Sequence, residues 1–152
     1  MKEKWKKKMN NQICKFSEGM VTIPEGYTER TLNTLADKRS VLPPITLSRD
    51  ALGNHNCTEE YIESQLGMLS KQVKDWQQAP GESITLGDNV ATGLLISYNF
   101  LRPDNHRQYQ KQAIFTFNTD DLLIFTLSKA SPITDKEMQC FTDTLNSFRT
   151  HD

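Results

Sequence analysis

The stretch from Ser83 to Ser128 constrains the fold most, because extended, apolar-rich segments alternate along it with turn sequences. Strands are expected over residues 83–86, 89–101, 108–117 and 122–128. The first connection, Gly87-Asp88, has the length and the leading glycine of a tight hairpin turn. Residues 103–106 and 118–121, which are rich in Asn and Asp, form the next two turns. The segment therefore predicts an antiparallel meander.

Shorter strands are expected before the meander. Residues 13–35 contain two turn sequences, Ser17-Glu18-Gly19 and Pro24-Glu25-Gly26, which divide them into two or three short strands. Residues 38–44 look like a loop. Ile45–Ser48 then restores a strand pattern, which Gly53-Asn54 ends.

A first amphipathic helix is expected between these strands and the meander. Asn56 and Glu59 have the spacing of a capping box, in which each residue satisfies a free backbone amide of the other. Four apolar residues then repeat at i, i+4, i+7 and i+11 and place one face against the sheet: Ile62, Leu66, Leu69 and Val73. This helix is predicted to run to about Lys74.

A second amphipathic helix is expected at the end of the chain. Thr134 precedes Glu137 by three residues, which is again capping-box spacing. The apolar face that follows consists of Met138, Phe141, Leu145 and Phe148. The fold class is therefore α+β, a curved antiparallel sheet with two amphipathic helices. Residues 13–150 are expected to form a single domain, because 152 residues suit one hydrophobic core.

The first eight residues carry a concentration of positive charge, with five lysines and one glutamate. The other residues hold 13 basic and 18 acidic side chains, a net charge of −5, so the folded part has no basic field for nucleic acid. We predict that residues 1–12 form a disordered basic arm; an arm that touches nucleic acid or a membrane is the alternative. A natural start at Met9 is a further alternative.

The chain has no run of the roughly 18 apolar residues that a membrane span needs. The lysines are followed by Met9-Asn10-Asn11-Gln12 and not by the apolar segment of a signal peptide. We therefore expect a cytoplasmic protein that does not insert into membranes. Cys14, Cys57 and Cys140 are far apart, which suits reduced thiols better than a disulfide framework.

No catalytic residue, metal site or cofactor is predicted. The histidines His55, His106 and His151 have no metal-ligand spacing to one another or to cysteines, and the glycines form no phosphate-binding loop. Arg49-Asp50 with the nearby Glu59 and Glu60 resembles an acid–base pair only superficially, since strand-end and helix-start electrostatics explain these charges. We expect a protein that is not an enzyme.

The strand over 108–117 has one side rich in amides. Alternation places Gln108, Gln110 and Gln112 on that side, together with Ile114 and Thr116. A solvent-facing polar surface is the simple interpretation. The other is a row of donors and acceptors for a bound polypeptide. The apolar arc of the first helix is likewise wider than one packing stripe needs, because it is extended by the line of Gln65, Leu69 and Val73 and by Met68 and Trp76. Core packing would explain this width, and so would a groove for an apolar helix.

Four segments carry a family resemblance: Ile23-Pro24-Glu25-Gly26-Tyr27 with Thr31-Leu32-Asn33, Ile45 to Asp50, Tyr61 to Leu66, and Tyr109 to Phe115. In this order and spacing they resemble the DcrB-like family, from about Ile13 to Phe148. Within it they are most similar to the effector-associated (Eag) chaperones of bacterial type VI secretion.

The resemblance implies a DcrB/PsbP-like sandwich that assembles as a homodimer with a concave face. It implies a chaperone or adaptor that shields the N-terminal transmembrane helices of a secreted PAAR or Rhs effector, stabilises the effector and promotes its loading onto the secretion spike. By position, the two cargo-binding glutamines of the family correspond to Gln65 and Gln112, and apolar cargo contacts to Leu32, Leu69 and Val73. Thr34, Thr46 and Gln108 stand at further positions where the family is apolar, which implies a more polar groove.

Two alternatives remain open from the sequence. The first is a generic DcrB/PsbP-like protein-binding module with a different partner, which would itself be an envelope-associated protein. The second is a small enzyme with a site that shows no known motif.

Overall fold

The computed structural model describes residues 12–151 of the chain. Two compact units divide the sequence, Met1–Thr31 and Leu32–Asp152. The predicted basic arm of residues 1–12 lies outside the described residues, except for Gln12.

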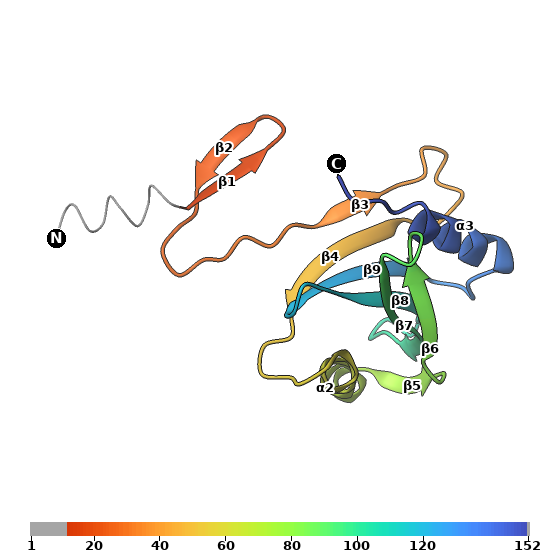
Figure 1. Ribbon diagram of the computed structural model, residues 1–152. Coiled ribbons are helices and arrows are strands. Elements are labelled where there is room, and N and C mark those ends of the chain that lie inside the picture. The colour runs from red at the N-terminus through yellow and green to blue at the C-terminus, as the bar shows by residue number, and fades with distance from the viewer. Residues whose placement is uncertain (1–11, 152) are drawn as a thin grey trace, which may run out of the picture. The chain divides into compact units, whose positions relative to one another are not determined.

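The described part of the first unit is a β-hairpin (Figure 1). Strand β1, Ile13–Phe16, pairs antiparallel with β2, Gly19–Thr22, across a two-residue turn. After the hairpin, the amide of Tyr27 donates to the carbonyl of Pro24 at 3.1 Å, and Gly26 adopts a positive φ of 83° that glycine tolerates without strain. Both turns predicted in this segment are thus present.

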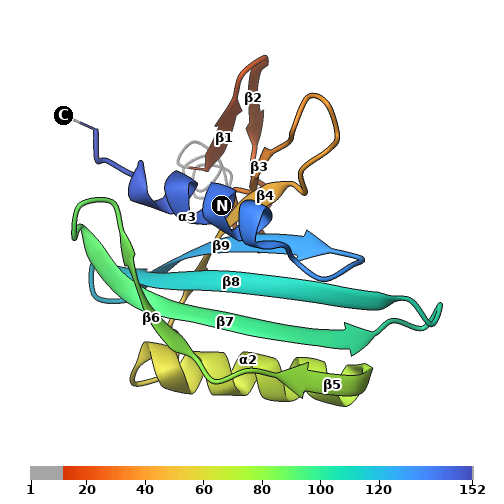
Figure 2. The same ribbon diagram turned by 90° about the vertical axis from the view of Figure 1, so that its right-hand side faces the viewer.

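A seven-stranded sheet forms most of the second unit, and every strand pair in it is antiparallel. The strands are β3 (Asn33–Leu35), β4 (Ile45–Ala51), β5 (Lys74–Gln78), β6 (Glu82–Leu86), β7 (Ala91–Leu101), β8 (Arg107–Phe117) and β9 (Asp121–Lys129). Their order is β3-β4-β9-β8-β7-β5, and β6 pairs with the other half of β7. The sheet is open, and β6, β7, β8 and β9 pair in sequence order to form the predicted meander (Figure 2).

Each face of the sheet packs against one helix. Helix α2 runs over Thr58–Gln72 and α3 over Asp135–Asn146. On the face that we call the α2 face, Ile62 and Leu66 of the helix pack with alternate sheet residues such as Ile114. On the opposite α3 face, Phe141 and Leu145 pack with the intervening residues: Leu95, Ala113, Phe115, Phe125 and Leu127. The prediction of an α+β fold with two amphipathic helices on an antiparallel sheet is confirmed.

The two helix starts differ from each other. Thr134 caps α3 in a complete capping box with Glu137, as predicted. The box predicted for the first helix is wrong, because Cys57 occupies the N-cap of α2 and makes no side-chain capping bond. Asn56 is one residue too early for that role, and its amide instead donates to Glu60 at 3.3 Å.

Three further boundaries differ from the sequence prediction. Helix α2 ends at Gln72, where Val73 becomes extended and leads into β5, a strand that the sequence pattern did not indicate. Strand β4 continues through Arg49 and Asp50 to Ala51. The connection between β6 and β7 has four residues rather than two, because Asn89 as well as Gly87 takes a positive φ and Val90 still belongs to the turn.

Candidate functional site

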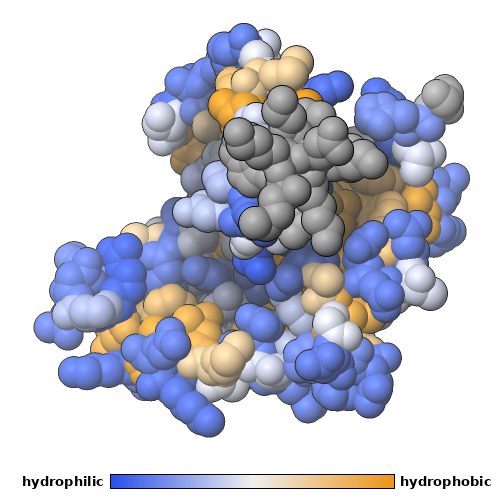
Figure 3. Space-filling model, turned by 90° about the vertical axis from the view of Figure 1, so that its left-hand side faces the viewer, coloured by the Kyte–Doolittle hydropathy of each residue, from blue (hydrophilic) through white to orange (hydrophobic). Residues whose placement is uncertain are grey.

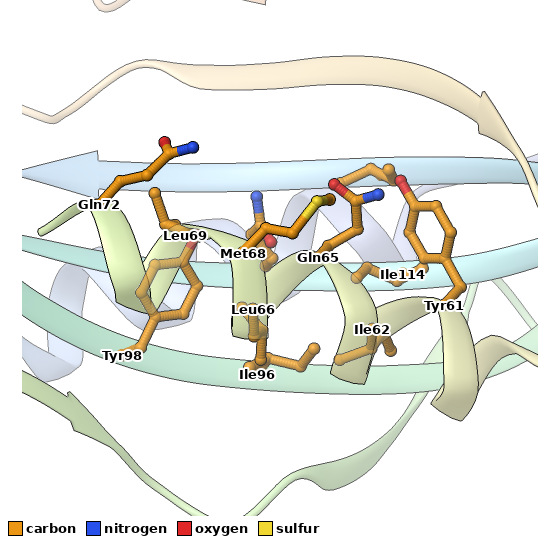
Figure 4. A pocket seen from close by; sticks show the side chains of 12 residues that line it. Tyr61, Ile62, Gln65, Leu66, Met68, Leu69, Gln72, Ile96, Tyr98 and Ile114 are labelled. Atoms are coloured by element: carbon orange, nitrogen blue, oxygen red, sulfur yellow. The ribbon is translucent and has the colours of Figure 1, made fainter.

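A groove of about 370 Å³ lies between α2 and the α2 face of the sheet (Figure 4). Side chains from one helix and three strands form its walls and floor. They are Tyr61, Ile62, Gln65, Leu66, Met68, Leu69, Gln72, Ile96, Tyr98, Gln112, Ile114 and Ile124. Most are apolar, and three are glutamines.

Helix α2 contributes two adjacent stripes to this groove. Ile62 and Leu66 are buried and, with the half-buried Leu69, pack down onto the sheet. The second stripe, Tyr61, Gln65, Met68 and Gln72, repeats at i, i+4, i+7 and i+11 and lies beside the first. Figure 4 shows Gln65, Met68 and Gln72 pointing to the same side of the helix. Met68 is 52% exposed, so residues 12–151 leave about half of this apolar residue uncovered.

The floor of the groove comes from β7, β8 and β9. Ile96 pairs directly with Gln112, and Gln112 pairs with Thr126, so an amide stands in a row between an apolar and a hydroxyl side chain. The next row along these strands, Ile114 with Ile124, is buried and apolar. A bound chain would therefore meet an apolar floor with one embedded amide.

The glutamines of β8 differ in which of their side-chain hydrogen-bonding groups are already in use. Gln108 donates to the Ser128 hydroxyl, and Gln110 accepts from the Tyr98 hydroxyl at 2.6 Å. Gln112 makes one side-chain bond, from its Nε2 to Thr126 Oγ1 at 3.3 Å, and its carbonyl oxygen accepts none within residues 12–151. Gln65 is exposed and makes no side-chain hydrogen bond to the described residues. These two amides can therefore bond to a ligand.

Two hydrogen bonds fix the start of α2 against the sheet. The Tyr61 hydroxyl donates to Asp50 Oδ2 of β4 at 2.5 Å, and the hydroxyls of Thr58 and Thr116 bond at 2.6 Å. The helix wall is thus tied to both β4 and β8, which sets the position of Gln65 one turn further on.

An aromatic stack supports the other end of α2. Trp76 of β5 stacks on Tyr98, with ring centroids 4.8 Å apart, and burial raises the pKa of Tyr98 to about 12. Arg107 donates to Asn99 and to Asp75, which holds β5 alongside β7. Strand β5, which the sequence alone did not predict, therefore supports Tyr98 from behind without lining the groove itself.

The structure brings three of the expected cargo-binding residues together: Gln65, Leu69 and Gln112 all line the groove. Val73 packs against the same apolar cluster at the end of α2 without lining the groove. Thr34, Thr46 and Gln108 lie on the α2 face outside it. Leu32 precedes β3, is 64% exposed, and does not belong to the groove.

Several groove residues were not singled out from the sequence as site residues: Tyr61, Gln72, Ile96, Tyr98 and Ile124. Alternation along β7 and β9 would have placed Ile96, Tyr98 and Ile124 on one face. The register that brings this face under α2 depends on tertiary pairing, however, and no local pattern gives it.

Figure 3 shows a side of the molecule on which hydrophilic residues predominate and apolar residues gather in patches, one of them low in the view. Between residues 12 and 151, no helix is both long enough and apolar enough to cross a bilayer. In the same range, no three His, Cys, Asp or Glu side chains group as ligands for a metal ion.

Comparison with known protein families decides the classification. The model of the DcrB family matches residues 18–147, which is most of the chain. The chain belongs to the DcrB family. The matched range includes all the residues that line the groove. No curated protein sequence gives a significant match.

Two solved structures are similar to this chain. A crystal structure of PA94, a protein of unknown function from Pseudomonas aeruginosa, superposes with a TM-score of 0.64 at 16% sequence identity, covering 93% of this chain and 97% of PA94. A solution structure of the PsbP protein CyanoP from the cyanobacterium Synechocystis sp. PCC 6803 has a TM-score of 0.47 at 13% identity, covering 84% and 83% of the two chains. At this identity, PA94 supports the fold alone.

Proposed function

We propose that this DcrB family protein is a chaperone that binds apolar helices of another polypeptide in the groove beside α2. The observation that carries the proposal is the groove itself, in which an exposed methionine and two incompletely bonded glutamines surround an apolar floor. Family membership supports a protein-binding role. The cargo proposed is the N-terminal transmembrane region of a type VI secretion effector of the PAAR or Rhs type, which the protein would stabilise and help to load.

Such a protein is needed because the apolar surface of the cargo must be kept out of water before the cargo reaches a membrane. A helix that will later cross a membrane exposes about 20 apolar residues, and in water this surface aggregates or enters the wrong bilayer. Burying apolar surface contributes roughly 25 cal/mol per Å² before the cost of ordering the complex. Helix α2, with 15 residues, is about 22 Å long, so it can lie along most of one such helix.

The two amides add what apolar contacts lack. A membrane helix carries small polar side chains and, at its end, backbone carbonyls without intrahelical partners. The amides of Gln65 and Gln112 can donate to such groups, and the Gln112 carbonyl can accept. A polar group buried against the groove without such a partner would cost about 1–3 kcal/mol.

The proposal also includes assembly as a homodimer in the cytoplasm, and binding without catalysis. Exposed apolar side chains in the first unit, such as Phe16, Met20 and Val21 of the hairpin, are consistent with a further protein contact. Light scattering of the purified full chain gives the mass that tests the dimer.

Co-expression tests the proposed cargo. The full chain is produced with a tagged N-terminal transmembrane segment of a PAAR or Rhs effector, and the amount that co-purifies is measured for wild type and for the double variant Gln65→Ala/Gln112→Ala. The double variant should keep its fold and retain several-fold less cargo. Gln139→Ala, which removes an exposed amide from α3, is the matched control and should retain the wild-type amount. Equal recovery from wild type and the double variant would refute the assignment of the groove.

A further inference from the structure

A band of hydroxyl side chains continues the groove floor beyond the helix. Thr34 pairs with Thr46, Thr46 with Thr126, and Thr126 with Gln112, so these side chains stand in one row across four strands. Ser48 lies in the next row, opposite Ile124. We call Thr34, Thr46, Ser48 and Thr126 the hydroxyl ledge. It lies on the α2 face, on the strands at the β3 edge of the sheet.

The ledge is open to a ligand. Apart from the Tyr61–Asp50 bond at its start, helix α2 packs on β8 and β5, towards the edge of the sheet opposite β3. Thr46, Ser48 and Thr126 are half-buried and Thr34 is exposed. Within the described chain the hydroxyls of Thr34, Thr46 and Ser48 make no side-chain hydrogen bond, and Thr126 receives only the bond from Gln112. Each hydroxyl can both donate and accept.

The spacing suits one helix lying alongside α2. Neighbouring strands are about 4.8 Å apart, so Thr46 on β4 stands about 10 Å across the sheet from Gln112 on β8. An α-helix is about 10–12 Å wide, and packed helices lie 8–10 Å apart. A helix lying over β9 would thus contact Met68 and Leu69 of α2 on one side and the hydroxyl ledge beneath it.

We infer that the groove and the ledge together select a helix with two unlike sides: an apolar side for Met68 and Leu69, and a stripe of small polar residues for the ledge. This inference rests on the proposed function and names the chemistry of its cargo. A uniformly apolar helix would bury the ledge hydroxyls without partners, which is unfavourable. Small residues such as serine, threonine and glycine in a stripe permit close approach, and the serine and threonine hydroxyls return hydrogen bonds to the ledge.

The test uses two lysine-flanked synthetic peptides of identical Leu, Ala and Ser content, both helical. In one the serines form a single stripe at i, i+4, i+7 and i+11, and in the other they are spread around the helix. Their dissociation constants are measured with the full-length protein by fluorescence anisotropy. Wild type should bind the striped peptide roughly tenfold more tightly, the effect of about one net hydrogen bond.

Substitutions in the ledge locate this preference. Thr46→Val/Ser48→Ala keeps the shape of the ledge and removes two hydroxyls, so the two peptides should bind about equally to it. Thr85→Val, at an exposed position on β6, is the matched control and should keep the preference.

The outcomes separate the inference from the function on which it rests. Equal binding of both peptides to wild type overturns the inference and leaves the proposed function standing. Failure of both to bind overturns both. If the ledge variant keeps the peptide preference but changes the molar mass in light scattering, the ledge is an interface between copies and the inference is wrong.

Discussion

Gln112 on β8 and Thr126 on β9 stand directly opposite each other, and the amide Nε2 donates to the hydroxyl at 3.3 Å. Among the described residues, this is the one side-chain bond of Gln112, and it orients the amide at the foot of the groove while its carbonyl oxygen accepts no bond. On the same strand, the side-chain carbonyl of Gln110 accepts a hydrogen bond from the Tyr98 hydroxyl within the protein. Gln110 is therefore a structural glutamine, whereas the side-chain carbonyl of Gln112 can still bond to a ligand.

Removing the hydroxyl of Tyr61 should destabilise the protein. The bond to Asp50 at 2.5 Å joins α2 to β4, and Tyr61 is buried. Hydrogen bonds to a charged group contribute roughly 1.5–3 kcal/mol, so Tyr61→Phe should lower the free energy of unfolding by about that amount. Urea denaturation measures it. Tyr109→Phe, at a half-buried position on β8, is the control and should cost less.

Two glycines should respond to alanine with opposite signs. A Cβ on Gly93 of β7 would press into the backbone carbonyl of Ile114 on β8, whereas one on Gly67 of α2 meets nothing within 4 Å. Gly67→Ala should stabilise the protein by about 0.5–1 kcal/mol, the usual gain in a helix. Gly93→Ala should destabilise it by about 1–3 kcal/mol, because packed strands must shift. Thermal unfolding gives both signs, and a stable Gly93→Ala protein would contradict the pairing of β7 with β8.

The Glu137 carboxylate should make stability depend on pH in acid. Its bonds to Lys129, at 2.7 Å, and to the Thr134 backbone amide, at 2.8 Å, lower its pKa. A carboxylate with a lowered pKa stabilises the fold above its unfolded-state pKa, and this contribution disappears as the pH falls through the folded-state value. Urea midpoints from about pH 6 to about pH 3 should therefore fall less steeply in Glu137→Gln than in wild type. Parallel curves would show that Glu137 does not titrate as its contacts require.

Tyr98 should resist ionisation in alkali. Burial raises its pKa to about 12, above that of a tyrosine in the unfolded chain, so its contribution to stability is complete below about pH 10 and declines as the pH rises further. Phenolate absorbance between about pH 10 and pH 11 should be the same for wild type and Tyr98→Phe while both stay folded. A smaller signal in the variant would show that Tyr98 is exposed.

The sequence was sufficient to predict those elements whose patterns are local. Alternation along 108–117 assigned Gln112 and Phe115 to opposite faces, and Thr134 with Glu137 marked the start of α3. Strand β5 was missed because Lys74 to Gln78 is polar apart from Trp76, and its place depends on β7 and on the Arg107–Asp75 contact. The cap of α2 was misplaced because Asn56 and Glu59 have box spacing one residue before the true start.

The candidate site follows the same division. Gln65, Leu69 and Gln112 were named through a family resemblance, and the structure places them in one groove. Strand register supplied the rest of the site: it brings Tyr98 and Ile124 under α2 and aligns Thr34 with Thr46 and Thr126. Pairing between strands far apart in the sequence has no local signature.

Binding of a dye-labelled, lysine-flanked apolar helix to the purified full chain tests the central claim most directly. Wild type should bind it saturably. Met68→Asp should weaken binding at least tenfold, because Met68 is exposed at the edge of the groove and an aspartate there would place a charge against the apolar surface of the bound helix. Val90→Asp, at an exposed apolar position in the β6–β7 turn, should bind like wild type. Equal affinities for Met68→Asp and wild type, with both folded, would contradict the account.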